Sequence, residues 1–438
     1  MRIHTWIGAL VLASGTASAQ QIPDSTARKQ QRALDSLSAA VAALHARLDS
    51  VAAAAAATPA PAVRAAGAYM NASFVGLTTF GWASTADVPS IEVGDHDARV
   101  RGFTIPNAEF VLDGAVDPYF KGVANMVYKL DAKGESGLEL EEMYFLTTSL
   151  PYNLQLKGGQ AFVEFGRQNL QHPHAWAFAD QPLVLNRMFG PEGLRSQGLR
   201  LSWLLPTSFY TEATLGVFNS AGTTTWSFRS DESGSIHGGA AMERAVGGAR
   251  DLLYVPRLAT SFDLTSTQTL LVGASGAFGP NNSGPAAGTQ IAGADLYWKW
   301  KSPRASQGFP FVAFQAEAIQ RRYDAAMRPA GVDALVTLPS QVIKDRGAYA
   351  QLQWGIQPRV IAAIRAEEVG GDEVATPAFS VSDRINRSRY STNVTWFPTE
   401  FSKFRVQYNY DRRAGLGRDH SVWMQFEFLL GAHAAHKF

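Results

Sequence analysis

Residues Lys403–Asp411 read KFRVQYNYD, and this stretch decides the fold class. Its even-numbered positions are apolar or aromatic, while its odd-numbered positions are polar or charged. A period of two places successive side chains on opposite faces of a β-strand. In a strand that crosses a bilayer, the apolar face meets lipid and the polar face meets a wet lumen. The stretch therefore predicts outward-facing Phe404, Val406, Tyr408 and Tyr410, and inward-facing Lys403, Arg405, Gln407 and Asn409.

The same alternation recurs elsewhere, for example over residues 294–301, 312–318, 348–357 and 422–430. From Tyr69 to Leu430 the pattern gives about sixteen candidate strands. A barrel of about 16–18 strands leaves an aqueous channel, whereas one of about eight is filled by side chains. A soluble sandwich would also alternate, but it would not need Trp and Tyr near its strand ends, where membrane barrels carry interfacial girdles. The girdle candidates are Trp203, Trp300, Trp354, Trp396, Tyr390 and Tyr410.

The connections between candidate strands come in two lengths. Short proline-containing connections, such as 150–152 and 397–400, alternate with long stretches rich in Gly, Ser and Asp, such as 220–250 and 369–385. Short periplasmic turns and long extracellular loops are the outer-membrane pattern. We therefore predict an all-β protein of the bacterial outer membrane, a transmembrane antiparallel up-and-down β-barrel of about 16 strands.

The N-terminal region predicts export and a helical extension ahead of the barrel. Small residues at Ala17–Ala19 follow a short apolar stretch, which indicates a signal peptide over residues 1–19. Residues 20–57 are strong helix formers, and six of them form an a/d stripe: Leu34, Leu37, Val41, Leu44, Leu48 and Val51. The stripe favours a periplasmic coiled coil, most simply a homotrimer, over a lone amphipathic helix. An Ala/Pro linker at 58–68 then leads into the barrel at 69–438.

Composition excludes several classes of protein. A formal net charge of +1 with 18% charged residues argues against a nucleic-acid binder. The chain has no cysteine, so a disulfide framework and a thiolate metal site are both impossible. No cofactor is implied. The expected partners are outer-membrane lipids and small hydrophilic solutes or ions, with peptidoglycan as a further contact for the helical extension.

Two stretches carry a family resemblance. KGGQAFVEFG at Lys157–Gly166 ends a strand before a long loop, and NRMFGPEGLRSQGLRLSW at Asn186–Trp203 enters the next strand. This arrangement resembles the phosphate-selective porin O and P superfamily, and the ending QFEFLLGAHAAHKF is similar to that of other porin-like outer-membrane proteins. The resemblance implies a trimeric barrel of about 16 strands with a periplasmic coiled coil. Ala161 and Val163 replace the lysine of the family's strand-end pattern, so phosphate selectivity does not carry over.

Residues 167–198 are too long for a turn and too aromatic for a disordered loop, which favours a segment that folds into the lumen and constricts it over a surface loop. Charges at such a constriction set selectivity through the local field. The candidate pore-lining residues are Lys157, Arg187, Arg195, Arg200, Glu317, Arg365, Glu367, Lys403 and Arg405. An excess of basic residues between Arg384 and Arg418 favours a weak anion preference, although Glu317 and Glu367 offset it in a lumen that only solvates its charges.

Neither a metal site nor a catalytic residue is expected. His172 with His174, and His433 with His436, offer only two ligands each, too few for a tetrahedral site. Ser421 beside His420 is the one local pair that a hydrolase could use, but adjacent residues on a strand face opposite sides. We predict a porin for passive diffusion of small hydrophilic solutes. The alternatives are a structural or adhesive barrel and, less favoured, a barrel hydrolase.

Overall fold

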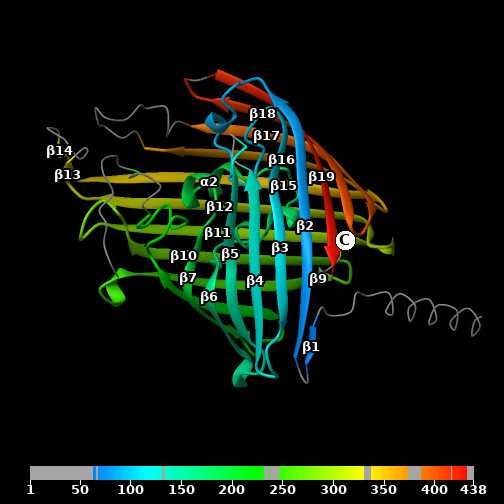
Figure 1. The fold of residues 1–438 in the computed structure, drawn as a ribbon, viewed down its shortest axis with the longest axis horizontal. Helices are drawn as coiled ribbons and strands as arrows, with labels where there is room; N and C mark the ends of the chain where they lie inside the picture. Colours follow the sequence, from blue (N-terminus) through cyan, green and yellow to red (C-terminus); the bar gives the residue numbers. More distant parts are fainter. Residues whose placement is uncertain are drawn as a thin grey trace, which may run out of the picture. The chain divides into compact units, whose positions relative to one another are not determined.

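The computed structural model describes residues 63–65, 68–130, 134–230, 236, 246–329, 337–372, 386–415 and 417–431. The predicted signal peptide, N-terminal helix and coiled coil lie outside these residues, as do His433 and His436. The described residues belong to one compact unit, Ala60–Phe438. Its body is a single antiparallel β-sheet that closes on itself (Figure 1).

Sixteen strands of nine or more residues, with the three-residue β1 (Val63–Ala65), form this sheet. They are β2 (Ala68–Ala83), β3 (Gly102–Ala115), β4 (Phe120–Leu130), β5 (Ser136–Thr147), β6 (Leu154–Phe162), β7 (Arg195–Leu204), β8 (Tyr210–Asn219), β9 (Leu252–Thr265), β10 (Gln268–Pro280), β11 (Gly288–Ser306), β12 (Phe309–Ala325), β15 (Gln341–Gln357), β16 (Val360–Gly371), β17 (Arg387–Thr399), β18 (Ser402–Arg413) and β19 (Gly417–Gly431). A separate ribbon pairs β13 (Arg328–Pro329) with β14 (Thr337–Leu338), and short 3-10 turns lie at η1 (Val88–Ile91), η2 (Pro151–Asn153) and η5 (Ala249–Asp251).

The sheet is a closed up-and-down barrel. Each long strand pairs with the next one along the chain, and β19 returns to pair with β2 from Ser421↔Ala83 to Gly431↔Ser73. Closure leaves no edge strand, so the backbone groups of the wall pair with one another, as a bilayer requires. In Figure 1, β2–β5 cross the direction of β9–β18 on the opposite wall, as the tilted strands of a barrel do. The predicted architecture of sixteen antiparallel strands is confirmed.

The strand register places apolar side chains outside and polar side chains inside. On β18, Phe404 and Val406 are 45% and 51% exposed, whereas Lys403 and Gln407 are 2% and 0% exposed, which confirms the predicted faces. Exposed apolar side chains continue around the outer surface, among them Phe103, Leu138, Leu199, Leu258, Ile364 and Val394. An apolar surface this continuous is a lipid-facing surface, because a monomeric soluble protein rarely exposes one.

Aromatic side chains mark the outer surface as predicted for a girdle. Trp203, Trp354, Trp396 and Tyr390 are all exposed on the outer face. Tyr390 stacks on Tyr410 of the neighbouring strand, and Trp396 stacks on Phe404.

None of the helices among the described residues is long and apolar enough to cross a membrane.

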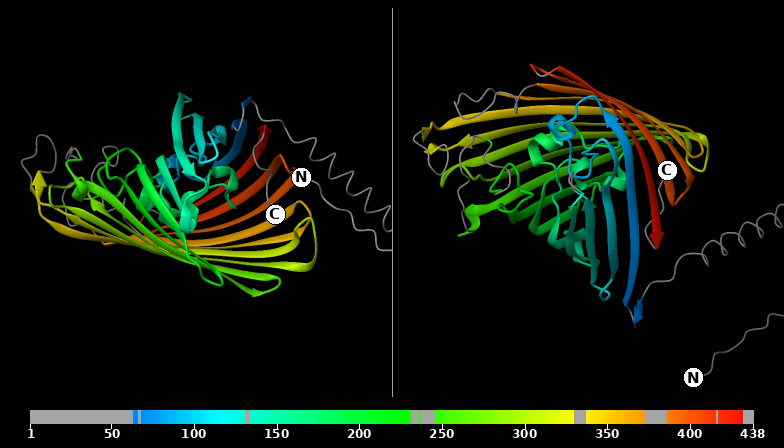
Figure 2. Two further views of the ribbon diagram at one scale, coloured as in Figure 1. Left: turned by 90° about the horizontal axis from the view of Figure 1, so that it is seen from below. Right: turned by 45° about the horizontal axis from the view of Figure 1, so that its top comes forward.

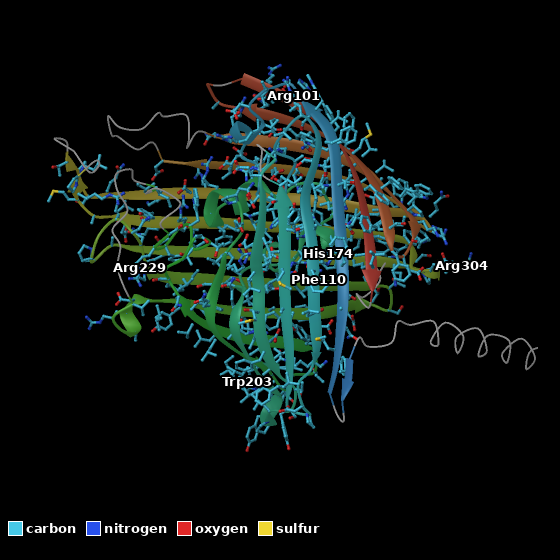
Figure 3. The ribbon with its side chains drawn as sticks, in the orientation of Figure 1. Arg101, Phe110, His174, Trp203, Arg229 and Arg304 are labelled. Atoms are coloured by element: carbon cyan, nitrogen blue, oxygen red, sulfur yellow. The ribbon has the colours of Figure 1, made fainter. Side chains whose placement is uncertain are left out.

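Short turns lie at one end of the barrel and long connections at the other. Two-residue turns join β9 to β10 and β11 to β12. In the second of these, Gln307 and Gly308 both have positive φ, 51° and 88°, which a tight hairpin turn requires. Figure 3 shows Trp203 and Arg304 toward the end with short turns, and Arg101 and Arg229 toward the end with long connections.

Candidate functional site

Residues 163–194, called the inserted segment below, connect β6 to β7 through the interior of the barrel. The segment contains η3 (Gln168–Leu170), η4 (Pro173–Ala175) and the short helix α2 (Leu183–Phe189). α2 contacts β12, β15 and β16 within the curve of the wall (Figure 2). The sequence predicted an inward fold with bounds of 167–198; the structure moves both bounds toward the N-terminus because β6 ends at Phe162 and β7 already begins at Arg195.

Glycines at two turns let the chain leave the wall and finish α2. Gly166 has φ 62°, and a Cβ there would overlap Oε2 of Glu317 on β12. Gly190 ends α2 with φ 82°, where a Cβ would be 3.0 Å from the side chain of Trp226. Glycine tolerates both the left-handed backbone and the close approach, and larger residues do not.

An apolar core holds one half of the inserted segment. The segment contributes Val163, Phe165, Val184, Leu185, Met188, Phe189 and Leu194. The wall and the β8–β9 connection contribute Phe218, Phe228, Leu253, Val255, Ala277, Ile291, Ile319 and Tyr349. Each large apolar side chain buried in this way contributes about 1.5–3 kcal/mol. The inner wall around β8–β12 is therefore partly apolar, unlike the wet inner wall expected of an open barrel.

Asp180 fixes the other half of the segment to the wall. Its Oδ1 accepts hydrogen bonds from Arg365 (2.5 Å) and Gln407 (2.8 Å). Its Oδ2 accepts from Asn409 (2.8 Å) and Arg389 (3.3 Å). All five side chains are buried, and the arginines hold the pKa of Asp180 below its ordinary value even though burial opposes this. Residues from three strands thus converge on one carboxylate of the segment.

Glu317 and Glu367 bind the backbone of the segment rather than facing open water. Oε1 of Glu317 accepts from the backbone N–H of Gln168 (2.6 Å) and from the hydroxyl of Tyr349 (2.8 Å). Oε2 of Glu367 accepts from the backbone N–H of Leu183 at the start of α2 (2.6 Å). A carboxylate at a helix N-terminus also favours the helix dipole.

Lys403 and Arg405 face inward as predicted, but both are engaged. Nζ of Lys403 lies 2.8 Å from Oε2 of Glu427 and donates to the carbonyl oxygen of His174 (2.6 Å). Arg405 donates to the carbonyl oxygen of Trp176 (2.7 Å). The inserted segment covers both side chains, and their role in selectivity stays a prediction.

The other predicted pore-lining residues are paired as well. The ion pairs are Lys157 and Arg200 with Glu164, Arg187 with Glu92, Arg195 with Glu139 and Glu192, and Arg365 with Asp180 and Glu367. The structure therefore places the predicted residues in several separate ion-paired groups inside the barrel. These ion pairs join the inserted segment to its surroundings, and the charges of the predicted residues are largely compensated.

A second basic group, which the sequence did not single out, has no such compensation. Arg167 stacks over the ring of Tyr297, with its guanidinium carbon 4.0 Å from the ring centroid. Lys299 lies 4.9 Å from the ring centroid of Phe311, within electrostatic range of Arg167 and the exposed Lys301. Among the described residues, no carboxylate forms an ion pair with any of the three. Alternation along β11 places the two lysines inward, but only the structure reveals that they lack a counter-charge.

Asp97 ties the β2–β3 connection to the inserted segment and should make that contact depend on pH. Its carboxylate accepts from the backbone N–H groups of Gly94 (2.6 Å) and Gln181 (3.0 Å). Burial and repulsion from Asp180 raise the pKa of Asp97 to about 7. A raised pKa favours the protonated group in the folded protein, so its stabilisation is full below the ordinary carboxyl pKa and is lost as pH rises through about 7.

We therefore expect the inserted segment to resist proteolysis better at pH 5 than at pH 8, and Asp97→Asn to reduce this difference. The measurement is the half-life of the folded barrel under a protease active at both pH values. Asp263→Asn, a change at an exposed carboxylate on β9, is the control. An unchanged pH dependence in the Asp97→Asn protein would contradict the assignment.

Ser421 and His420 do not form a catalytic pair. Ser421 is buried and faces inward, while His420 is exposed on the outer face of β19, where its Nδ1 lies 2.7 Å from the hydroxyl of Tyr408. The two side chains lie on opposite faces of the strand, as the alternation predicts.

A closed sixteen-stranded barrel with an apolar exterior and an inserted segment inside defines a transmembrane β-barrel of the outer-membrane porin architecture. Solved structures share this fold. The outer membrane channel DcaP of Acinetobacter baumannii is 13% identical with a TM-score of 0.52, covering 85% of this chain and 100% of that one. The anion-selective porin from Comamonas acidovorans is 8% identical with a TM-score of 0.51, covering 83% and 100%.

The family is shown by a sequence relative. The chain is 32% identical over 356 residues to an uncharacterized protein of Aquifex aeolicus (strain VF5), which covers 77% of this chain and 70% of that protein. The chain belongs to the same family as the Aquifex protein. No family model matches the chain, so the resemblance to the phosphate-selective porin O and P superfamily stays a prediction.

Proposed function

We propose that this chain is an outer-membrane porin through which small hydrophilic solutes and ions diffuse passively. The observation that carries the proposal is the closed sixteen-stranded barrel with an apolar outer face and charged and polar side chains inside. A barrel of this size encloses more space than the side chains of its own wall can fill. The inserted segment narrows that space and sets the size limit for solutes. The names of the two structural neighbours, a channel and an anion-selective porin, support this function.

The proposal includes an orientation in the membrane and an oligomeric state. Outer-membrane lipids surround the apolar face, and the short turns face the periplasm. The N-terminal extension lies in the periplasm, where its a/d stripe joins three protomers and peptidoglycan is within its reach. The a/d stripe and the family resemblance support the trimer.

The test is single-channel recording of the purified protein in a planar bilayer. We expect stepwise currents that arrive in threes. A folded barrel that inserts but carries no current would overturn the proposal and favour the structural or adhesive alternative. A current that arrives in single steps would retain the porin and overturn the trimer.

We also propose a weak anion preference, carried by Arg167, Lys299 and Lys301 rather than by Arg365, Lys403 and Arg405. The first three are uncompensated among the described residues, while the last three are held by the inserted segment. An elementary charge about 8 Å from a passing ion in a water-like medium contributes roughly 0.5 kcal/mol, or about a factor of two in relative permeability. The effect should grow as salt is lowered, because screening weakens.

We expect Lys299→Gln to reduce the chloride-to-potassium permeability ratio by roughly two-fold, and the triple variant with Arg167→Gln and Lys301→Gln by several-fold. The reversal potential under a salt gradient at low ionic strength measures this ratio. Arg412→Gln removes one charge from the outer face of β18 and is the matched control. A triple variant with the wild-type reversal potential would contradict the proposal that these three residues carry the anion preference.

A further inference from the structure

A cluster of histidine and glutamate side chains joins the inserted segment to β3, β4 and β5. His172 of the segment meets Glu109 of β3, Asn125 of β4, and Glu141 and Glu142 of β5. The carboxylates and Asn125 are buried, and His172 is largely covered. In Figure 3 the neighbouring His174, whose Nδ1 lies 3.2 Å from Oε2 of Glu109, appears beside β3 and β4. His172, Glu109, Asn125, Glu141 and Glu142 are called the His172 cluster below.

The His172 cluster carries more negative than positive charge. Three carboxylates meet there, and the nearest permanent cation is Arg195, whose Nη1 lies 3.5 Å from Oε1 of Glu141. Arg195 is shared, because it also pairs with two carboxylates outside the cluster, Glu139 and Glu192. Burying uncompensated carboxylates is costly. Protons on the imidazoles or the carboxylates, or a bound cation, can compensate this charge.

The spacing of three ligand atoms suits a metal ion. Nδ1 of His172 lies 3.4 Å from Oε1 of Glu109 and 3.0 Å from Oε2 of Glu141. Two ligands that each lie about 2.0–2.1 Å from a tetrahedral zinc stand roughly 3.3 Å apart. All three ligand atoms lie within 4.8 Å of one another. The three atoms can therefore take one ion between them with little movement.

Asn125 can complete the coordination. Its Nδ2 lies 2.7 Å from Oε1 of Glu109, 3.0 Å from Oε2 of Glu141 and 3.2 Å from Nδ1 of His172, so the amide faces all three ligand atoms. Its Oδ1 is buried without a hydrogen-bond partner. The two ends of an amide exchange places when the side chain turns over. A turned amide would place this unsatisfied oxygen where a fourth ligand is needed.

The far side of the imidazole has the partner that metal-binding histidines usually have. Nε2 of His172 lies 3.0 Å from Oε2 of Glu142. A histidine that binds metal through one ring nitrogen commonly donates its other N–H to a carboxylate, which fixes the ring and strengthens the ligand.

We propose that Glu109, Glu141 and His172 bind a divalent transition-metal ion of the zinc class, with Asn125 as fourth ligand and Glu142 orienting the imidazole. One imidazole nitrogen among oxygen ligands selects zinc or its first-row neighbours over calcium and magnesium, which take oxygen ligands alone. The bound ion links the inserted segment to β3 and β5. The proposal stands on the cluster itself and does not depend on conductance.

The test is metal binding by the purified full-length protein in detergent. The protein is stripped with a chelator, dialysed, and titrated with Zn²⁺ by calorimetry, and Co²⁺ is used as an optical probe of coordination. We expect one Zn²⁺ per chain and the intense visible bands of four-coordinate Co²⁺, with no comparable binding of Ca²⁺ or Mg²⁺. His172→Gln and Glu141→Gln should weaken binding by more than about 100-fold, and Glu142→Gln by about 10–100-fold.

Two matched controls keep the result specific. Glu139→Gln changes another carboxylate of β5, and His420→Gln changes a histidine on the outer face, so both should bind like the wild type. Heat-modifiable migration on gels shows whether each variant is folded. Stoichiometric Zn²⁺ binding that survives both His172→Gln and Glu141→Gln would place the ion elsewhere and overturn the proposal. Wild-type protein that binds no Zn²⁺ would also overturn it and leave protons on the imidazoles or carboxylates to neutralise the cluster.

Discussion

Asp180→Asn is expected to loosen the inserted segment and to raise single-channel conductance and current noise. The native carboxylate accepts two hydrogen bonds on each oxygen, from Arg365, Gln407, Arg389 and Asn409. An asparagine keeps the shape but turns one acceptor into a donor that faces other donors. Removing one partner from a buried charge network typically costs about 3–5 kcal/mol. The ratio of docked to undocked segment should therefore fall by a factor of roughly 10² to several 10³.

Bilayer recording and limited proteolysis measure the two consequences of the Asp180 change. The segment should become cleavable in the folded barrel, while the barrel wall stays protected because its strand pairing is untouched. Asp263→Asn removes an exposed carboxylate on β9 and should leave both measurements unchanged. If Asp180→Asn retains wild-type conductance and protease resistance, the apolar core around α2 alone holds the segment, and Asp180 is not the fixing point.

The sequence predicts the wall well because alternation is a local property. In the nine residues Lys403–Asp411, apolar and polar side chains alternate without a break. The apolar side chains lie on the outer face and the polar ones on the inner face, as predicted. Lipid on one side and water on the other make the period of two strong in such a strand. The signal is weaker where both faces are apolar. Leu253, Val255 and Ile291 face inward, yet they are apolar because the inserted segment covers them.

The candidate site could be predicted only as far as the direction of its side chains. Alternation places Lys403 and Arg405 inside but cannot reveal that Glu427 and the backbone of the inserted segment satisfy them. Their partners are distant in sequence: Arg405 binds the carbonyl of Trp176 from 229 positions away. For the same reason the sequence does not reveal that Lys299 and Lys301 lack a counter-charge, since the absence of a partner is a tertiary property.

The His172 cluster also depends on residues that are distant in sequence. Reading His172 and His174 as a local pair leaves too few ligands for a metal. The carboxylates that complete the set come from β3 and β5, 63 and 31 positions before His172. A closed barrel brings such positions together without a local motif. Metal ligands inside a barrel are therefore hard to recognise from spacing alone.

Val406→Arg is expected to destabilise the barrel by about 2–4 kcal/mol in lipid vesicles. Val406 lies midway along β18, is 51% exposed on the outer face and is in register with Val394 and Met424. A guanidinium at this depth would lose water without gaining a partner from lipid. Chemical denaturation of the reconstituted barrel measures the cost, and Val406→Leu, which keeps the site apolar, should change the stability by much less.

Arg412 is an arginine that the outer face of β18 already carries. It lies on the same strand and the same outer face, six positions closer to the end that carries the long connections. The barrel accepts an arginine there because the side chain can reach the interface, where a lipid-facing charge costs only about 0–1 kcal/mol. The two positions share strand and face and differ in depth. Equal stability of the Val406→Arg and wild-type barrels would show that this face does not meet the middle of a bilayer, and the membrane assignment would fail with it.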